Sequence, residues 1–263
     1  MHYKRLVVAA ILVPLLYLYI MHLPAEYFLF LLVFVSTIAL IEFYAMFRIG
    51  AVLRYAGVAC GAALLAVFFT APHLFADVLL LSALSLMGLR LVIKRDPSSS
   101  LAEVSAVILG LLYIPGLLTF QLDLVRSGPV WIVMLYVSVW VSDSLAYYIG
   151  KGFGKRKLYV EVSPNKTVAG AVGSLAGGAV GAVFIRAVLL RQVSLTHSVL
   201  LGVTVGAASI VGDLVESMFK RDAGIKDSSN ILPGHGGILD KLDSVTFAGP
   251  VFYWLSVGLG LIN

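Results

Sequence analysis

Long apolar runs, separated by short polar segments, limit the fold of this chain more than any other feature. A helix needs about 20 mostly apolar residues to cross a bilayer, within a range of about 17–25. Nine runs meet or nearly meet this length: Leu6–Leu23, Phe28–Phe47, Tyr55–Ala71, Leu74–Ile93, Leu101–Phe120, Val130–Ile149, Val168–Leu190, Ser198–Glu216 and Val245–Ile262. Only 13% of the residues are charged, against about 25% in soluble domains. We therefore expect an all-α, polytopic integral membrane protein with about nine transmembrane helices.

The distribution of Lys and Arg predicts how these helices are oriented. If the N-terminus is cytoplasmic, 15 of the 19 basic residues fall on the cytoplasmic side, three fall outside, and Arg90 lies within a helix. Cytoplasmic loops of membrane proteins carry such an excess of positive charge. This topology also explains the net charge of +5 without nucleic acid as a partner. The compact chain suits a bacterial inner membrane.

Polarity divides the chain into two expected regions. Residues 1–125 form transmembrane helices that we interpret as a scaffold with a role in lipid access. Residues 126–263 hold the two longest polar loops, 150–167 and 217–244, and both fall on the cytoplasmic side. We therefore expect residues 126–263 to form the catalytic region, with its site facing the cytoplasm.

Seven carboxylates gather near the predicted cytoplasmic ends of the helices. Ionisable groups within membrane helices are costly and often functional. Glu103 begins its helix, where a negative charge suits the helix dipole, so we interpret it as structural. Glu42 fits a structural and a functional role equally well. We expect functional roles for the deeper Asp143 and Asp213. The remaining three are Glu216, Asp240 and Asp243.

Helical spacing groups several of these carboxylates. Asp213 and Glu216 share a helix face with Lys220, and Asp240 and Asp243 are three residues apart. Clustered carboxylates repel one another unless a cation neutralises them, and a site made only of oxygen ligands favours Mg²⁺. We assign the metal to Asp213, Asp240 and Asp243, with Asp227 as a further candidate.

Both polar loops combine basic residues with features that suit phosphate. In the first loop, the turn-like Ser163-Pro164-Asn165 leads to Lys166 at a helix start, which is a favourable place for an anion. In the second loop, glycines allow close backbone approach to a ligand. Candidate ligands in that loop are Lys220, Arg221, Lys226, Gly236, Gly237 and Lys241. His235 fits a general acid or phosphate donor and a structural turn residue equally well.

Glycines spaced by four residues mark the seventh apolar run. They are Gly173, Gly177 and Gly181. Small residues at this spacing let membrane helices approach closely, so we interpret them as packing residues.

The stretch from Ser217 to Asp243 resembles the signature of the phosphatidate cytidylyltransferases, also called CDP-diacylglycerol synthases. It reads S-x-x-K-R, then K-D, then H-G-G and D-K-x-D, with Lys241 where the family usually has arginine. The segment from Asp143 to Thr167 is also similar to the family, although Ala169 follows where the family usually has glutamate. The resemblance covers roughly residues 131–244.

This resemblance implies an enzyme, a nucleotidyltransferase of phospholipid biosynthesis. CTP and phosphatidate would give CDP-diacylglycerol and pyrophosphate, with Mg²⁺ and also K⁺ as cofactors. The expected phosphate ligands are Lys166, Lys220, Arg221, Lys226 and Lys241, with Gly236 and Gly237 offering N–H groups and Asp143 supporting the site. Lys166, Lys220, Arg221, His235 and Asp240 are the expected catalytic residues.

Three alternatives stay open. A CTP-dependent lipid kinase of the polyprenol type would also use basic loops and Mg²⁺, but would release CDP. A membrane transporter fits intramembrane acids, although here these gather on one side. An inactive relative that binds nucleotide or lipid fits Ala169. The sequence leaves the oligomeric state open, with a homodimer as one option.

Overall fold

A computed structural model of the chain describes residues 14–229 and 236–262. Residues 14–22 are helical and lead into the following elements. These are α2 (Ala25–Met46), α3 (Ala51–Thr70), η1 (Pro72–Leu74), α4 (Phe75–Ile93), α5 (Ser100–Leu111), the π-helical η2 (Leu112–Gly116), α6 (Leu117–Ser127), α7 (Pro129–Phe153), β1 (Lys157–Tyr159), β2 (Ser163–Thr167), α8 (Val168–Val188), α9 (Leu195–Asp222) and α10 (Leu239–Gly258). The only sheet in these residues is the antiparallel hairpin β1–β2.

The all-α membrane fold is confirmed. Seven helical segments of the described residues are long and apolar enough to cross a membrane, and they match seven of the nine predicted runs. The first run, Leu6–Leu23, lies largely outside the described residues. The ninth run falls in α10, which is helical but is not among the seven segments. The count of nine crossings and the cytoplasmic N-terminus stay predictions.

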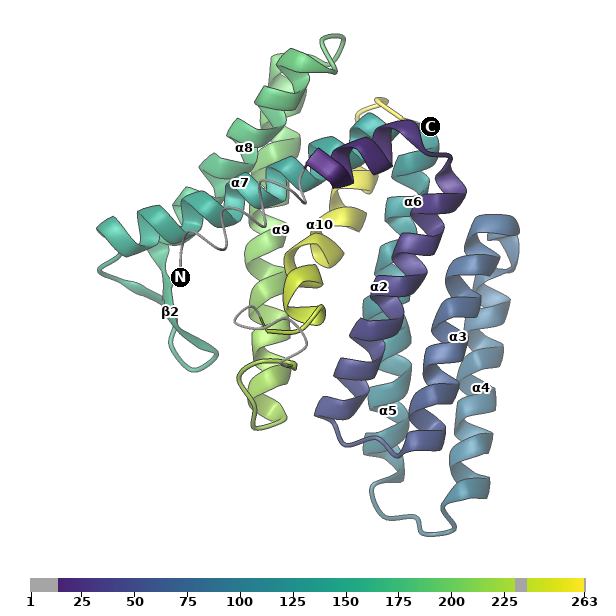
Figure 1. Cartoon of the computed structure of the whole chain (residues 1–263). Coiled ribbons are helices and arrows are strands. Elements are labelled where there is room, and N and C mark those ends of the chain that lie inside the picture. The colour runs from purple at the N-terminus through teal and green to yellow at the C-terminus, as the bar shows by residue number, and fades with distance from the viewer. Residues whose placement is uncertain (1–13, 230–235, 263) are drawn as a thin grey trace.

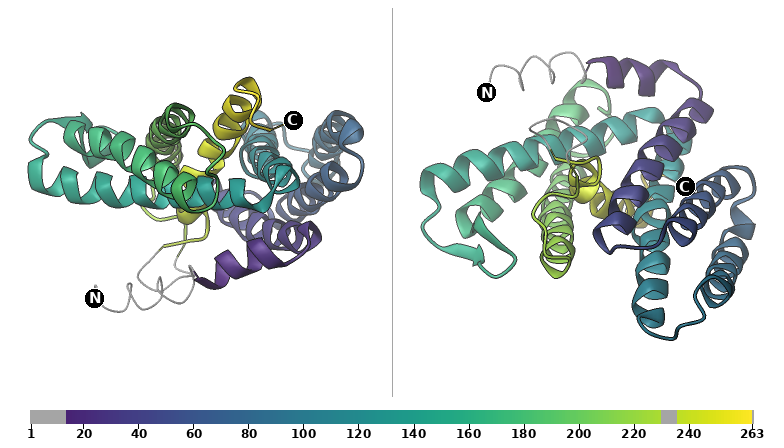
Figure 2. Two further views of the ribbon diagram at one scale, coloured as in Figure 1. Left: turned by 90° about the horizontal axis from the view of Figure 1, so that it is seen from above. Right: turned by 60° about the horizontal axis from the view of Figure 1, so that its bottom comes forward.

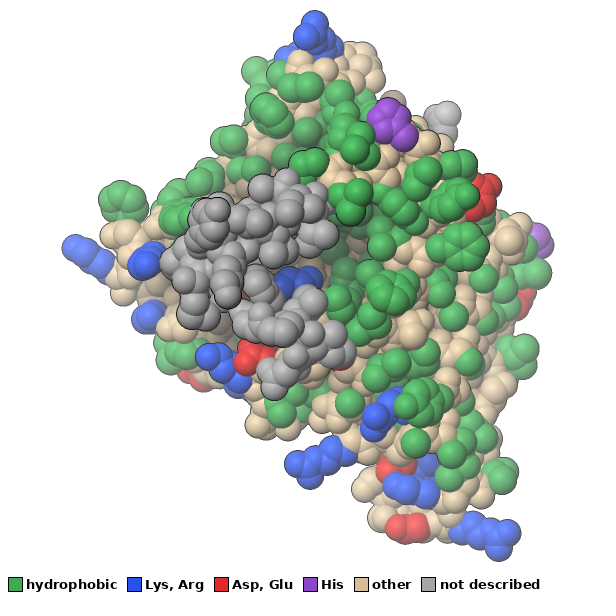
Figure 3. Space-filling view, viewed as in Figure 1, with side chains coloured by type: hydrophobic (Ala, Val, Ile, Leu, Met, Phe, Trp, Pro, Cys, Tyr) green, Lys and Arg blue, Asp and Glu red, His purple; other side chains and the backbone are tan. Residues whose placement is uncertain are grey.

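The helices form two groups joined by α10. Figure 1 shows α7, α8 and α9 on one side and α2 to α5 on the other, and the two views of Figure 2 show the same separation. Helix α10 packs against α9, α6 and α7 and also contacts α2. Most charged side chains on the face in Figure 3 lie toward its lower half, the end at which α4 and α9 finish.

Glycines on α8 bring three helices into backbone contact. A Cβ atom on Gly177 would lie 2.6 Å from the carbonyl oxygen of Val141 in α7. A Cβ atom on Gly178, the next residue, would collide with the carbonyl oxygen of Gly202 in α9. The prediction that the glycines of this helix serve packing is confirmed. Helix α8 therefore holds α7 and α9 at a spacing that larger side chains would prevent.

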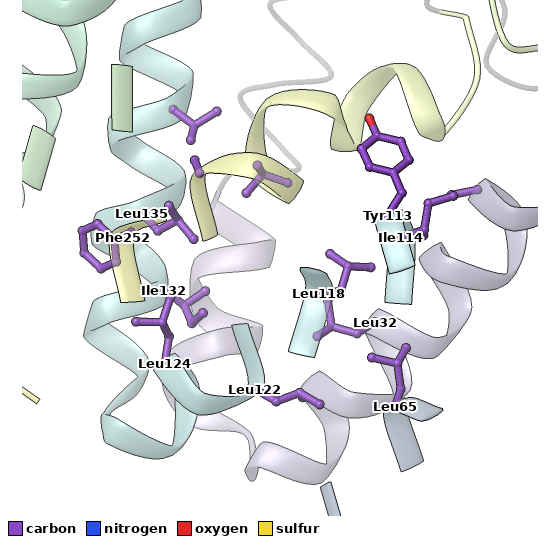
Figure 4. Packing of buried hydrophobic residues seen from close by; sticks show 14 of the residues in the cluster. Leu32, Leu65, Tyr113, Ile114, Leu118, Leu122, Leu124, Ile132, Leu135 and Phe252 are labelled. Atoms are coloured by element: carbon purple, nitrogen blue, oxygen red, sulfur yellow. The ribbon is translucent and has the colours of Figure 1, made fainter. Parts of the chain in front are cut away.

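Apolar and aromatic side chains fill the space between the two groups. Figure 4 shows residues of α2, α3, η2, α6, α7 and α10 in one cluster, including Leu118, Leu135 and Phe252. Aromatic contacts continue toward α9. The ring of Phe219 lies 5.8 Å from that of Phe43 and 5.6 Å from that of Tyr113. Helix α9 is thus fixed against the N-terminal helices by edge-to-face contacts of the kind that aromatic rings favour.

Glu103 has the structural role expected from its position. Its carboxylate lies 2.5 Å from Arg90 Nε and 2.5 Å from Lys94 Nζ. Arg90 is buried, and its guanidinium also donates to carbonyl oxygens of Lys94, Asp96 and Ser98. These bonds close the turn between α4 and α5.

Candidate active site

The candidate site lies where α9, α10 and the β1–β2 hairpin meet. Helix α10 approaches α9 closely because position 212 is a glycine, where a Cβ atom would collide with the carbonyl oxygen of Asp243 and lie 3.0 Å from Phe247 Cβ. This contact places the start of α10 beside the acidic residues of α9. The two ends of the loop 217–244, which carry the sequence signature, are therefore close together in space.

Lys220 is the centre of a buried ionic network. Its Nζ atom lies 2.7 Å from Asp240 Oδ1 and 3.2 Å from Glu216 Oε1. Glu216 is fully buried, and Lys220 and Asp240 are each 11% exposed at the side chain. Burial of unpaired charge is costly, so the ammonium is what allows two carboxylates to lie here. The network joins the end of α9 to the first turn of α10.

Asp240 also organises the loop that precedes α10. Its Oδ2 atom accepts hydrogen bonds from Gly237 N at 2.7 Å, Ser228 Oγ at 2.9 Å and Ser228 N at 3.1 Å. Burial alone would raise the pKa of Asp240, but the Lys220 ammonium and the N–H of Gly237 lower it to about 2. Both oxygens are thus engaged by protein donors, and the N–H of Gly237 is directed to Asp240.

Glu42 of α2 binds the same loop from the opposite side. Its side chain is buried, with 2% of the residue exposed. It accepts from Ser229 Oγ at 2.5 Å, Leu239 N at 2.8 Å, Ile238 N at 3.1 Å and Ser228 Oγ at 3.3 Å. The two backbone donors are N–H groups at the start of α10, which have no partner within the helix. A carboxylate from the N-terminal region therefore caps the helix that carries Asp240.

The two glycines before α10 are required by this packing. Gly236 has a φ of +81°, a left-handed conformation that favours glycine. A Cβ atom on Gly237 would lie 2.5 Å from both carboxylate oxygens of Glu42 and would collide with Ser228 Oγ. The glycines thus allow the backbone to lie between two carboxylates.

Lys166 reaches the site from the hairpin. Its Nζ atom lies 2.7 Å from Asp213 Oδ2, and Ser217 Oγ lies 3.3 Å from Asp213 Oδ1. The expected turn at Ser163–Asn165 is wrong, because these residues belong to strand β2, which pairs with β1. The strand runs directly into α8, where Thr167 Oγ1 accepts from Gly170 N as the N-cap. Pairing with β1 therefore holds Lys166 in an extended segment just before the helix.

Three carboxylates from different helices interact electrostatically. They are Asp143 of α7, Asp213 of α9 and Asp243 of α10. Burial first, and then the charge of Asp213, raise the pKa of Asp243 above its ordinary value. Among the described residues, no group of three or more acidic, His or Cys side chains is arranged so that it could hold a metal ion. The three carboxylates offer only oxygen atoms, the donors that Mg²⁺ prefers, so water and phosphate would have to complete the coordination of such an ion.

The remaining predicted residues lie around this centre. Arg221 donates to the carbonyl oxygens of Val162 at 3.3 Å and Ile225 at 2.9 Å, so it fastens the hairpin to the end of α9. Three further candidates are exposed: Lys226, Asp227 and Lys241. His235 lies outside the described residues.

Two carboxylates contribute more than the sequence indicated. The sequence is equally compatible with a structural and a functional role for Glu42, and it does not single out Glu216 as a site residue. Both are buried acids in apolar helices, and that local contrast is the signal that could have identified them. Ser228 was missed because its partners, Glu42 and Asp240, are set by the tertiary fold.

These observations define a polytopic membrane protein in which buried acidic and basic side chains line one polar loop. Comparison with known proteins extends this description. The model of the cytidylyltransferase family matches residues 3–257. The chain therefore belongs to the cytidylyltransferase family.

Individual relatives agree with this assignment. A phosphatidate cytidylyltransferase of Haemophilus influenzae is 37% identical over 193 residues, which cover 67% of each chain. One of Aquifex aeolicus is 34% identical over 193 residues, 71% of each chain. One of Pseudomonas aeruginosa is 50% identical over 122 residues, 46% of this chain and 45% of the relative.

Proposed function

We propose that this chain transfers the cytidylyl group of CTP to phosphatidate and so forms CDP-diacylglycerol and pyrophosphate for phospholipid biosynthesis. The observation that carries the proposal is the convergence of Lys166, Lys220 and the carboxylates of α9 and α10 in a member of the cytidylyltransferase family. The relatives are phosphatidate cytidylyltransferases, which indicates a cytidylyl donor and phosphatidate as the two substrates. The site would face the cytoplasm at a bacterial inner membrane, where CTP is available.

The reaction needs positive charge more than it needs a base. A phosphate monoester has a second pKa near 6, so the lipid phosphate is largely dianionic at neutral pH. One of its oxygens attacks the α-phosphorus of CTP, and the bond from that phosphorus to pyrophosphate breaks. Both reactants are anions, so positioning and electrostatic stabilisation supply the rate enhancement.

The residues of this chain have distinct parts in this scheme. Lys166 has a buried Nζ atom that pairs with Asp213, and this ammonium can exchange Asp213 for a phosphate oxygen. Asp213 and Asp243 would be the residues that hold Mg²⁺, and the ion would supply positive charge that neutralises phosphate. Lys220 keeps Asp240 in place, and Asp240 holds the loop. The metal roles of Asp240 and Asp227, and the use of K⁺, stay predictions.

Pyrophosphate release from CTP tests the proposal. Purified full-length protein in detergent is assayed with and without phosphatidate and Mg²⁺, and the lipid product is identified by mass. Release that requires both, together with a CDP-lipid, is the expected result. Release of CDP from CTP in the presence of a lipid alcohol, with no pyrophosphate release in the presence of phosphatidate, would favour the lipid kinase instead.

A pair of carboxamide variants locates the site. Asp243→Asn should reduce turnover at least about 100-fold, the scale of losing one electrostatic group at a transition state. Asp123→Asn is the matched control, because Asp123 lies on α6 and pairs with Arg126 at 3.6 Å. Equal turnover in both variants would remove Asp243 from the site.

A further inference from the structure

Glu42 is remote from the signature in sequence but joins it in space. Its four hydrogen bonds span 186 to 197 positions along the chain. A carboxylate has about four lone-pair positions, and four donors face this one. Among the described residues, the donors to Glu42 all come from one loop and the start of one helix.

The bonds of Glu42 fix the residues that hold Asp240. Ser228 donates its hydroxyl toward both carboxylates, at 3.3 Å to Glu42 and 2.9 Å to Asp240. Gly237 lies between the same two groups, with no room for a Cβ atom. Displacement of Glu42 would therefore release the loop on the side opposite Lys220.

We infer that Glu42 is a positioning residue for this reaction. It acts through the loop and the first turn of α10, and it sets the place of Asp240 and the glycines relative to α9. The N-terminal helices then take part in the chemistry through one carboxylate, in addition to serving as a scaffold. The kinetic consequence rests on the proposed function, whereas the structural consequence can be measured without it.

Glu42→Gln is the variant that isolates this role. It keeps the size of the side chain but replaces one acceptor oxygen by an NH₂ group, which then faces donors. We expect kcat/KM for CTP, per folded protein, to fall about 10–100-fold. This is the range found for residues that orient a functional side chain without contacting the substrate themselves. Glu42→Asp keeps the charge on a shorter side chain and should recover part of the loss.

Hydrogen exchange of the backbone provides the readout that does not depend on activity. In Glu42→Gln, the amides of Ile238 and Leu239 should exchange faster than in the wild type, while those of α8 should not change. Glu103→Gln is the control, because it breaks two ion pairs of the N-terminal region that do not involve the loop. Its exchange at 238–239 and its kcat/KM should equal those of the wild type.

Three results would overturn the inference. The first is unchanged exchange at 238–239 in Glu42→Gln. The second is a lower folded fraction with normal kcat/KM per folded molecule, which is the mark of a purely structural acid. The third is an equal loss in Glu103→Gln. Absence of pyrophosphate release from the wild type would instead count against the proposed function. The comparison of hydrogen exchange would then be the test of whether Glu42 holds the loop.

Discussion

Lys220 offers a direct test of how the buried charges of the site are balanced. Its ammonium is 2.7 Å from Asp240 and 3.2 Å from Glu216. Lys220→Met keeps most of the apolar side chain and removes the charge. Two buried carboxylates then lose the same cationic partner.

The contacts of the two carboxylates set the expected cost. Removing one partner of a buried ion pair destabilises a protein by about 3–5 kcal/mol. Asp240 keeps its three donors from Ser228 and Gly237. Glu216 is fully buried, and Lys220 is its only ion-pair partner among the described residues. Glu216 is thus left as an unpaired buried carboxylate. We therefore expect the free energy of unfolding to fall by about 3 kcal/mol, which lowers the unfolding midpoint of a chain this size by roughly 6–12 °C.

Thermal unfolding in detergent measures this loss, and a triple variant gives its cause. Glu216→Gln, Lys220→Met and Asp240→Asn together remove all three charges, so most of the stability should return while turnover stays lost. A midpoint for Lys220→Met within about 2 °C of the wild type would refute the reasoning. A triple variant that unfolds no later than Lys220→Met would show that packing, and not unpaired charge, causes the loss.

Two further substitutions test local geometry. Gly237→Ala should displace the Glu42 carboxylate and lower kcat/KM roughly 10–100-fold. This factor corresponds to about 1.5–3 kcal/mol, the contribution of one charged hydrogen bond. Gly152→Ala is the control and should leave kcat/KM unchanged, because a Cβ atom there meets nothing within 4 Å. Ser174→Ala removes hydrogen bonds to Ser142 Oγ at 2.6 Å and to a carbonyl of α9 at 3.0 Å, so the unfolding free energy should fall by about 1–3 kcal/mol. An unfolding midpoint of Ser174→Ala equal to that of the wild type would contradict this expectation.

Hydropathy predicted much of this fold because lipid imposes a simple rule. Every backbone group of a membrane span must be satisfied internally, so a long apolar run becomes a helix. This reasoning located seven candidate spans and the packing role of the α8 glycines. It could not locate the β1–β2 hairpin, because Pro164 and Asn165 favour turns and the strand depends on its pairing with β1.

The candidate site was predicted in part. The spacing of Asp213, Glu216 and Lys220 on one helix face indicated a shared surface, and the structure places Glu216 against Lys220. The partner of the loop could not be predicted, because nothing in the local sequence of Glu42 indicates a contact nearly 200 residues away. Likewise, residue types alone do not show which Lys and Asp side chains pair with each other and which are available to bind a ligand.

The glycine contacts of α8 predict a very uneven tolerance to change along the chain. Saturation mutagenesis should find almost no accepted replacement at Gly177 or Gly178, since even one methyl group meets the backbone of a neighbouring helix. Helix α4 is the least buried of the seven candidate spans and presents Leu80, Leu81 and Leu84 at its surface. The exposed positions of α4 should accept most apolar residues. The turn between α3 and α4, next to this tolerant helix, is therefore a suitable place to attach a label or a fusion partner.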